Sequence, residues 1–454
     1  MKSKAGTDTE FFRTEKIPKI LLQIAPPVML AQLIQAMYNI VDSFFVGKYS
    51  ESALTALSVI YPLQLIIIAL AVGTGVGVNT YMARLYAQKM PGQAEETAGT
   101  GTLLALGTWF IFAIFSIFCM RPYVLTSANT PEAIESAVIY GQIVCIGSIG
   151  AFLEGNWTKV HQSRGNMHRP MVAQTVGALT NIVLDPILIF GLGPVPELGV
   201  RGAAWATVIG QVASAVLLFV FHLRLNREFD RGIRQLKPET AVIRDIYTIG
   251  LPAIIAQALM SVMVYAMNLI LKFDAAAQTA YGLFYKVQQF VLFLAFGLRD
   301  AITPIVAYGC GMGSRKRVED GIRYGLFYTA VLMAAGFALT ELFPGAFASL
   351  FNPGQSRAYF IGAMRVISLS FVFAGINIAL QGVYQALGGG MESLVLSLLR
   401  QVVIVLPLAY AFSLAVRSGL AGVSLIWWAI PIAEALSCAA GCVLLQRIRR
   451  KNLG

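Results

Sequence analysis

Long apolar stretches recur along the whole chain and are separated by short polar breaks, as at residues 63–78, 103–120 and 402–416. A helix crosses a bilayer in about 20 apolar residues, whereas strands of an outer-membrane barrel alternate in polarity over about ten residues. Because these stretches are solidly apolar, they predict an all-α polytopic membrane protein. The breaks divide the chain into twelve expected helices, with cores at residues 18–47, 53–83, 97–120, 132–155, 170–192, 199–223, 245–271, 278–308, 322–343, 358–386, 393–416 and 420–446.

The composition supports this fold class and narrows the function. Of the 454 residues, 57% are hydrophobic and 13% are charged, whereas about a quarter are charged in a typical soluble domain. The net charge of +11 does not indicate a nucleic-acid partner, because Lys and Arg lie in short loops rather than in one patch. The five cysteines and three histidines do not have the spacing of zinc ligands, and a disulfide framework is not expected.

Basic residues indicate which side of the membrane each loop faces. With a cytoplasmic N-terminus, the inner segments collect roughly 24 Lys and Arg and the outer segments roughly 6, as the positive-inside rule expects. An even number of spans returns the C-terminus to the same side. No small-residue cleavage motif follows the first apolar stretch, so this stretch is expected to remain as the first helix. The prediction is a multi-pass protein of the plasma (inner) membrane with both termini cytoplasmic.

The two halves of the chain resemble each other at an offset of about 225 residues. Matching pairs include Pro27 and Pro252, Gly73 and Gly297, Gly101 and Gly325, and Gly165 and Gly388. We expect residues 1–230 to form an N-lobe with a cytoplasmic linker and residues 231–454 to form a C-lobe, as two pseudo-symmetric six-helix bundles around a central cavity. Parallel repeats of this kind suit alternating access, because rocking one bundle against the other opens either side in turn.

Polar side chains inside the first expected helix are candidates for function, because ionisable groups in a bilayer are costly. They fall at positions i, i+3, i+4 and i+7, along one helix face: Gln35, Tyr38, Asn39 and Asp42. The alternative for Asp42 is a solvated position at the outer end of the helix, near Lys48 and Glu51.

The fifth expected helix carries a second intramembrane carboxylate. Asn181 and Asp185 lie one turn apart. Pro186 cannot donate to the carbonyl of Ile182, which frees a backbone oxygen beside the carboxylate. Two carboxylates, an amide and a spare carbonyl supply the oxygens that could bind sodium or share a proton.

Pro26 and Pro27 lie inside the first expected helix. Proline within a helix removes a hydrogen bond and bends the helix, so a kink is expected here. We hypothesise that this bend responds to protonation of Asp42, half a helix away.

The C-terminal half has a different polar pattern, since the cores of the seventh and tenth helices hold no carboxylate. The ionisable residues in or near its spans include Lys286, Arg299, Asp300, Arg365, Arg400 and Glu434. We expect Glu434 to form a buried structural pair with Arg400, because unpaired charges in lipid are costly; a role in transport is the alternative. A stripe of Met260, Met263 and Met267 is expected to face lipid or the core, although such flexible surfaces also suit varied ligands.

Together these features resemble the MATE family of multidrug and toxic-compound extruders over nearly the whole chain. The resemblance rests on the twelve spans, the two lobes, Pro26 with the segment QAMYNIVDSFFVG at residues 35–47, and the segment NIVLDP at residues 181–186. The sequence looks most like the DinF-type and MepA-type branch. Members of the NorM-type branch carry cation-binding carboxylates in the C-lobe, and the absence of those residues here argues against that branch.

The resemblance implies roles for individual residues. The cation or proton site would contain Asp42, Asn181, Asp185, Tyr140 and Thr207. A sodium ion would bind at Asp42, Asn181, Asp185 and Thr207. The drug cavity would be lined by Gln35, Tyr38, Asn39 and Asn156, and Pro26 would provide the conformational kink. No cofactor is expected beyond the coupling ion, H⁺ or Na⁺.

The leading interpretation is a secondary antiporter that exports amphipathic, cationic compounds while protons or sodium ions flow in. Its partners would be small organic molecules and the lipid bilayer, with no nucleic acid, and it is expected to act as a monomer. A lipid-linked oligosaccharide flippase of the same superfamily is an alternative, but that function favours a basic cavity and the one expected here is acidic. An intramembrane enzyme is a distant alternative, because no H-E-x-x-H, G-x-S-x-G or P-loop pattern occurs.

Overall fold

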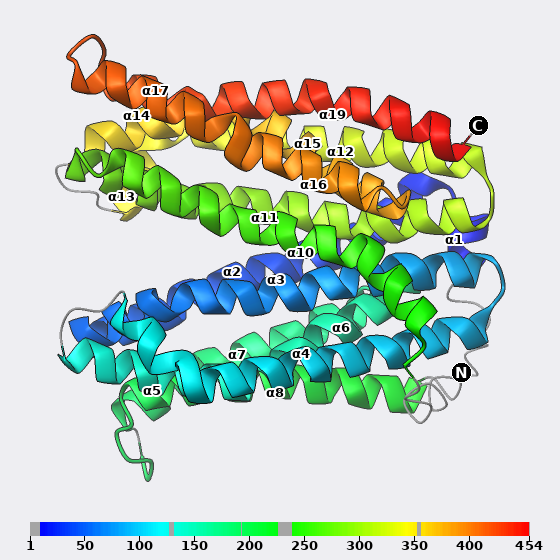
Figure 1. Cartoon of the computed structure of the whole chain (residues 1–454), viewed down its shortest axis with the longest axis horizontal. Coiled ribbons are helices and arrows are strands. Elements are labelled where there is room, and N and C mark those ends of the chain that lie inside the picture. The colour runs from blue at the N-terminus through cyan, green and yellow to red at the C-terminus, as the bar shows by residue number, and fades with distance from the viewer. Residues whose placement is uncertain (1–9, 127–130, 192, 226–237, 352–355, 454) are drawn as a thin grey trace. The chain divides into compact units, whose positions relative to one another are not determined.

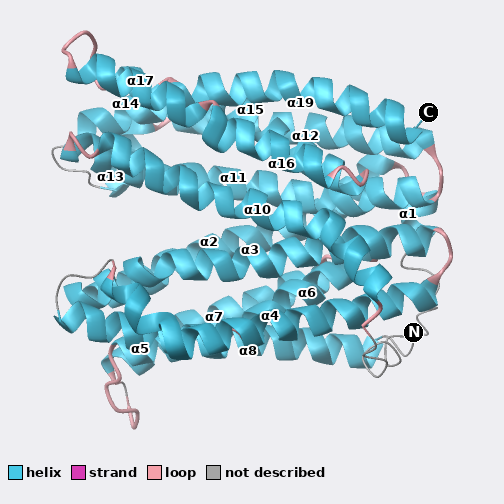
Figure 2. Ribbon diagram, viewed as in Figure 1, coloured by secondary structure: helices cyan, strands magenta, loops and turns pink. Residues whose placement is uncertain are grey.

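The structure is a computed structural model that describes residues 10–126, 131–191, 193–225, 238–351 and 356–453 (Figure 1). Every regular element in these segments is a helix, and none is a strand (Figure 2). Eleven of the described helices are long and apolar enough to cross a membrane, and a bent pair raises the number to twelve when it is counted as one span. These findings confirm the prediction of an all-α polytopic membrane protein.

Contacts divide the chain into two compact units. The first unit comprises Met1–Thr14 and Leu30–Ile254, and the second comprises Glu15–Met29 and Ile255–Gly454. The helices that lie wholly in the first unit are α1 (Glu10–Thr14), α3 (Glu51–Ala87), α4 (Pro91–Leu125), α5 (Pro131–Gly147), α6 (Ile149–Ser163), α7 (His168–Phe190) and α8 (Val200–Leu225). Those of the second unit are α11 (Ala275–Gly311), α12 (Arg315–Leu342), α13 (Pro344–Phe351), α14 (Arg357–Ile367), η2 (Ser368–Ser370), α15 (Phe371–Ala386), α16 (Gly390–Leu398), η3 (Leu399–Val403), α17 (Val405–Arg417), α18 (Ser424–Trp427) and α19 (Ala429–Leu453). Two helices contribute to both units, α2 (Ile17–Tyr49) and α10 (Thr240–Leu271).

The fourth predicted helix, at residues 132–155, is broken in the structure. It consists of α5 and α6, which meet at Ser148 with a bend of 42°. The Ser148 hydroxyl donates to the carbonyl of Cys145 (2.7 Å), a local bond that competes with regular helical bonding. The second piece runs on to Ser163, past the predicted end, because most of the polar side chains after Gly155 are buried by packing.

The eleventh predicted helix, at residues 393–416, is also irregular. The π-helical turn η3 separates α16 from α17 and contains Arg400. Such a turn inserts one extra residue into an α-helix and frequently occurs at functional sites. Hydrophobic periodicity does not reveal an insertion of this size, so the predicted helix was continuous.

Small residues let α7 and α8 pack closely. A Cβ atom on Gly177 would lie 2.7 Å from the carbonyl oxygen of Gly210, and one on Gly210 would lie 2.7 Å from the carbonyl oxygen of Gly177. Close backbone approach at small residues is typical of membrane helices. This reciprocal contact fixes the register of α7 against α8, and with it the positions of Asp185 and Thr207.

Both α2 and α10 lie partly in each unit, and in both helices the boundary between the units falls at a position that matches in the internal repeat. In α2 the boundary falls at Leu30, just after Pro27. In α10 it falls at Ile255, just after Pro252. Proline removes a helical hydrogen bond, so each helix is locally weakened where it leaves one unit and enters the other.

We call the part of α2 that belongs to the second unit and the part of α10 that belongs to the first unit the exchanged segments. Two glycines that match each other in the repeat pack against the ends of these segments. Within the first unit, a Cβ atom on Gly73 would lie 2.6 Å from the backbone nitrogen of Ile254. Within the second unit, a Cβ atom on Gly297 would lie 2.7 Å from Cα of Met29. Each exchanged segment is therefore held at a glycine that leaves no room for a side chain.

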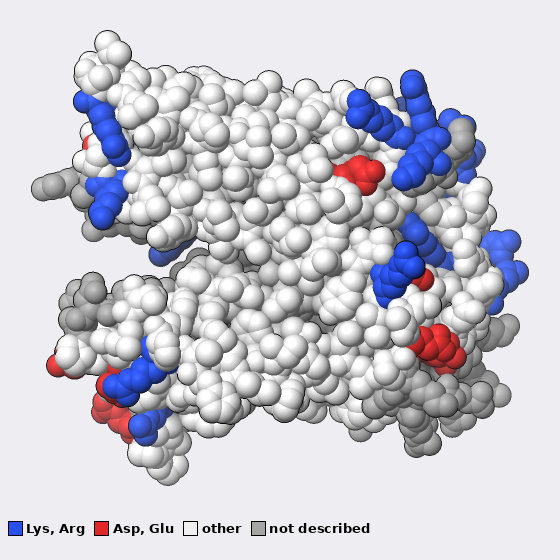
Figure 3. All heavy atoms as spheres, viewed as in Figure 1, with Lys and Arg blue, Asp and Glu red and all other residues white. Residues whose placement is uncertain are grey.

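Each unit has a core of its own and an apolar outer surface. Tyr140 and Phe152 are among the buried side chains of the first core, and Tyr281 and Trp427 are among those of the second. On the face shown in Figure 3, charged side chains gather toward the helix ends and leave the middle of the helices uncharged. This distribution is what a lipid environment requires of spanning helices.

Candidate functional site

Two carboxylates lie close together inside the first unit. Asp42 on α2 is 8% exposed, and Asp185 on α7 is fully buried. The two side chains interact electrostatically. Asp42 is therefore not a solvated residue at a helix end. Two negative charges at short range within a helical bundle repel each other, so the pair is stable with a shared proton or a bound cation.

Asn181 supports Asp185 from the preceding turn of α7. Its Nδ2 atom donates to Oδ1 of Asp185 over 3.4 Å. Pro186, inside the same helix, has no N–H to offer to the carbonyl of Ile182. Within about one turn, α7 thus presents the amide of Asn181, the carboxylate of Asp185 and the carbonyl of Ile182, which receives no hydrogen bond from Pro186.

Tyr140 on α5 and Thr207 on α8 lie at the same cluster. The buried Tyr140 hydroxyl accepts a hydrogen bond from Nε2 of Gln64 (3.2 Å). Its side chain also lies within interaction range of Thr207 and of Asp42. The helices α2, α5, α7 and α8 therefore bring together the residues that the family resemblance implied for coupling.

Several buried oxygens of this cluster accept no hydrogen bond from the described part of the chain. They are Oδ1 of Asp42, Oδ1 of Asn181, Oδ2 of Asp185 and Oγ1 of Thr207. Buried acceptors without a donor are costly and uncommon in native proteins. An oxygen-only set with two carboxylates fits a sodium ion, and the carboxylates alone fit a proton, so the residues present suit either coupling ion.

Tyr38 connects the acid pair to the rest of α2. Tyr38 and Gln35 are both partly buried, and Nε2 of Gln35 donates to the Tyr38 hydroxyl over 3.5 Å. The Tyr38 side chain interacts electrostatically with Asp42 and with Asp185. These two predicted cavity residues therefore lie beside the acid pair.

The other predicted residues lie apart from the acid pair. Asn39 is exposed on α2. Asn156 is buried and faces α4, where its Nδ2 atom donates to Oγ1 of Thr102 over 3.4 Å. Pro26 lies within the continuous helix α2, in the segment that belongs to the second unit.

Glu154 on α6 is a candidate that sequence patterns did not reveal. Its carboxylate lies against Gln174 of α7 and Ser214 of α8, and it interacts electrostatically with Tyr38. The fourth helix was predicted to end at residue 155, which made a carboxylate at 154 look like a boundary residue. The available signal was that Glu154 is the one charged residue in the stretch 136–158.

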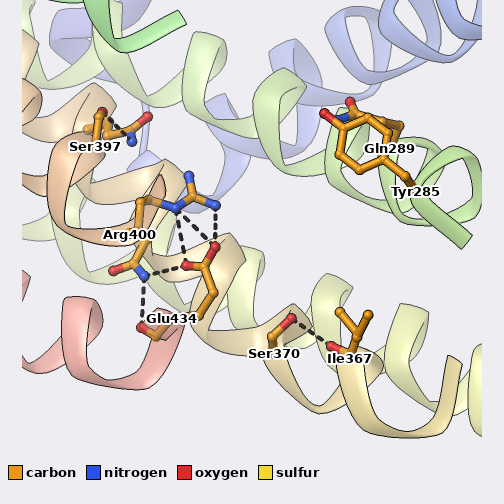
Figure 4. A network of polar contacts seen from close by, with 9 residues as sticks. Tyr285, Gln289, Ile367, Ser370, Ser397, Arg400 and Glu434 are labelled. Carbon is orange, nitrogen blue, oxygen red and sulfur yellow. Dashed lines mark hydrogen bonds and ion pairs between the residues drawn. The ribbon is translucent and has the colours of Figure 1, made fainter. Parts of the chain in front are cut away.

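The second unit contains a buried ion pair between Arg400 in η3 and Glu434 in α19 (Figure 4). Nη2 of Arg400 lies 2.7 Å from Oε1 of Glu434, and Nε donates to both carboxylate oxygens over 3.1 Å. Asn377 of α15 adds a bond from its Nδ2 to Oε2 of Glu434 (2.7 Å). The predicted pairing is confirmed, and every charge in it is compensated. By contrast, Lys286 is exposed on α11.

The methionine stripe on α10 faces the core of the second unit. Met267 is fully buried, and Met260 and Met263 pack against the same core. A second buried ion pair, between Arg299 and Asp300 (3.0 Å), lies on α11. Neither feature belongs to the acid cluster of the first unit.

Comparison with known proteins gives consistent matches along the whole chain. The MatE family model matches residues 27–187 and again residues 252–411. The two matches start about 225 residues apart, which confirms the internal repeat. The multidrug export protein MepA of Staphylococcus aureus (strain MRSA252) is 26% identical over 98% of this chain and 97% of its own. The protein of the same name from Staphylococcus saprophyticus is 24% identical, over 98% and 96%.

Solved structures share the fold. A MATE structure in complex with MaL6 has a TM-score of 0.91 and 23% identity, with 99% of each chain covered. A MOP superfamily transporter from Pyrococcus furiosus, for which reverse polarity of the binding pocket suggests a different function, has a TM-score of 0.89 and 23% identity, over 99% of this chain and 98% of that one. Both cover nearly all of this chain, so they share the fold described above along nearly its full length.

Proposed function

The chain belongs to the MATE family, and from this premise we propose that it exports amphipathic organic cations in exchange for protons or sodium ions. Family membership also confirms that it is a multi-pass membrane transporter and not an enzyme. The two staphylococcal relatives are multidrug export proteins, which supports varied organic compounds as substrates here. The observation that carries the proposal is the buried pair Asp42 and Asp185, with unpaired acceptor oxygens around it.

The acid pair supplies a physical basis for exchange. When both carboxylates are charged, they attract any cation that reaches them, whether it is a proton, a sodium ion or a cationic substrate. Binding of the coupling ion neutralises this charge and weakens the attraction for the substrate, and the reverse holds equally. Because the negative charge of this region acts on both cations, binding of one weakens binding of the other, and this links inward ion flow to outward substrate flow.

The sign of the charge in the first unit supports cations rather than anionic lipids as substrates. Its buried or partly buried carboxylates near Tyr38 are Asp42, Asp185 and Glu154. None of the ion pairs among the described residues involves any of the three. A flippase of pyrophosphate-linked sugars would need basic groups at this place, because phosphate is bound by Arg and Lys.

The proposal includes the orientation and the state of assembly. Both termini face the cytoplasm, since the basic residues are concentrated in the loops on that side. All residues of the acid cluster come from one chain, and a monomer is therefore sufficient for coupling.

Efflux measured in proteoliposomes tests the proposal. A fluorescent organic cation such as ethidium is loaded, and pH and sodium gradients are imposed separately for the wild type and for Asp185→Asn. We expect one gradient to drive efflux by the wild type and the mutant to fall to background while remaining folded and inserted. The exposed residue Glu132 on α5 provides the matched control, since Glu132→Gln should transport like the wild type.

The outcomes separate the alternatives. The gradient that drives efflux identifies the coupling ion. Full efflux by Asp185→Asn would remove the acid pair from the mechanism. A wild type that exports no cation under either gradient would favour a lipid-linked substrate instead.

A further inference from the structure

The internal repeat identifies the residue of the second half that corresponds to Glu154, and the partners of that residue are known from the structure. The matching pairs Val160 and Val383, Gln162 and Gln385, and Gly165 and Gly388 set the local offset. This offset is about 223 residues. It pairs Glu154 of α6 with Asn377 of α15.

The last helices of the two halves align at the same offset. Gly199-Val200 matches Gly422-Val423, and Trp205-Ala206 matches Trp428-Ala429. Gln211 then corresponds to Glu434, and Ser214 corresponds to Ser437. The first half thus has a carboxylate on its fourth helix and an amide on its sixth, Glu154 and Gln211. The second half has them the other way round, as Asn377 and Glu434.

In each unit a contact joins the same two helices of the repeat, although the residue reached on the second helix differs. In the second unit, Asn377 donates to Glu434 and so joins α15 to α19. In the first unit, Glu154 lies against Ser214 and so joins α6 to α8. Ser214 is itself buried, with 1% of its surface exposed.

The two carboxylates differ in how their charge is compensated. Glu434 is held by the guanidinium of Arg400 (Figure 4). The position equivalent to Arg400 is Gly177, where a Cβ atom would lie 2.7 Å from a carbonyl oxygen and 2.9 Å from Cβ of Ser214. The close contact of α7 with α8 therefore leaves no space for a basic side chain beside Glu154.

Glu154 is more exposed than Asp42 and Asp185 and interacts with a residue that also interacts with them. Its side chain is partly exposed, unlike that of Asp185. It interacts electrostatically with the phenol group of Tyr38, as Asp42 and Asp185 do. A carboxylate without a basic partner attracts an organic cation, and an aromatic side chain in the same region adds attraction through its ring face.

We propose that Glu154 binds the positive charge of the exported compound, in the place where Arg400 compensates Glu434 in the other unit. This inference rests on the proposed function and identifies the residue that binds the cationic centre of the exported compound, such as an ammonium or phosphonium group. Asp42 and Asp185 hold the coupling ion, and Glu154 is a specificity-determining residue beside them. Tyr38 interacts electrostatically with all three carboxylates.

The test measures binding of tetraphenylphosphonium, which is permanently charged and has no titratable proton, to purified full-length protein. We expect Glu154→Gln to weaken its affinity by about tenfold or more, as loss of a charged partner does. Glu154→Asp retains the charge and should keep most of the affinity. Size-exclusion profiles establish that both variants are folded, and Glu132→Gln is the matched control at an exposed site.

A second measurement needs no variant at Glu154. A hydrophobic carbodiimide modifies buried carboxyl groups, and peptide mapping by mass spectrometry reports the modification at Glu154. Saturating tetraphenylphosphonium should protect Glu154 in the wild-type protein. Absence of protection would overturn the inference.

The outcomes also separate this inference from the function on which it rests. If the wild type neither binds tetraphenylphosphonium nor exports it under any gradient, the proposed function fails and the inference fails with it. If the wild type binds and exports the probe, and Glu154→Gln binds it equally well, the inference alone fails. An equal loss in Glu154→Gln and Glu154→Asp would assign Glu154 a role in shape rather than charge and would also overturn it.

Discussion

At the scale of single residues, neighbours decide what a buried carboxylate does. Glu434 has an arginine and an asparagine as partners, so its charge is compensated within the protein. Asp185 has an asparagine and a second carboxylate as neighbours, and no ion pair among the described residues compensates its charge. Burial in a bilayer makes either arrangement costly to disturb; we expect the first to serve stability, and we propose the second for coupling.

Removal of the Glu434 charge should therefore affect stability more than transport. Glu434→Gln leaves Arg400 buried without its counter-ion, and breaking a buried pair in this way costs about 3–5 kcal/mol. We expect a clearly lower thermal unfolding temperature and an unchanged ratio of ions to substrate in proteoliposomes. The unfolding temperature is followed by size-exclusion chromatography after heating.

A double variant controls for the loss of charge as such. Replacing both partners, Arg400→Met with Glu434→Met, removes the unpaired charge and should recover much of the stability, since apolar replacement of a buried pair is often neutral. A stable Glu434→Gln protein that transports without coupling would show instead that this pair takes part in ion exchange.

At the scale of helices, the sequence specifies spans well and their interruptions poorly. Solid apolar stretches identified all the spanning helices, because length and hydropathy are set by the bilayer. The break at Ser148 is accompanied by one hydroxyl bond, and the π-turn at Arg400 by one buried ion pair. Such tertiary features leave no periodic trace in the sequence.

The candidate site was predictable to a similar degree. Asp42, Asn181 and Asp185 stood out because carboxylates and amides are rare inside apolar spans, and the structure places them together. Asn156 stays a predicted cavity residue; in the structure it is buried and donates to Thr102 on α4. Glu154 was missed because its helix continues beyond the predicted end through residues that are polar yet buried.

The glycines that hold the exchanged segments of α2 and α10 provide a test at this scale. In Gly73→Ala, the new Cβ would meet the backbone of Ile254, and in Gly297→Ala it would meet the backbone of Met29. Because a backbone cannot move aside as a side chain can, each change should destabilise its unit by about 1–3 kcal/mol. Thermal unfolding of the two variants measures the effect.

The matched control is Gly107→Ala in α4, where nothing lies within 4 Å of the added atom. Alanine is the better helix former, so this variant should be neutral or slightly more stable, by up to about 1 kcal/mol. Equal stability of all three variants would show that the exchanged segments are not held tightly at these glycines.

At the scale of the whole molecule, the internal repeat explains why one chain contains two versions of the same polar network. Duplication gives both halves a carboxylate and an amide at equivalent positions, Glu154 with Gln211 and Asn377 with Glu434. The arginine appears in the second half alone, at a position where the first half has Gly177. The second unit thus has a compensated carboxylate at this place, and the first has one without an ion-pair partner among the described residues, as the proposed export of cations expects.

The orientation of the molecule in the membrane is the last property that follows from the sequence. Roughly 24 basic residues on one side against roughly 6 on the other predict cytoplasmic termini. Cysteines introduced singly at Glu197, between α7 and α8, and at Lys451, near the end of α19, test this in a variant without its native cysteines. A membrane-impermeant maleimide should label the first in intact cells and the second only after permeabilisation. The reverse pattern would invert the assigned orientation of the two termini.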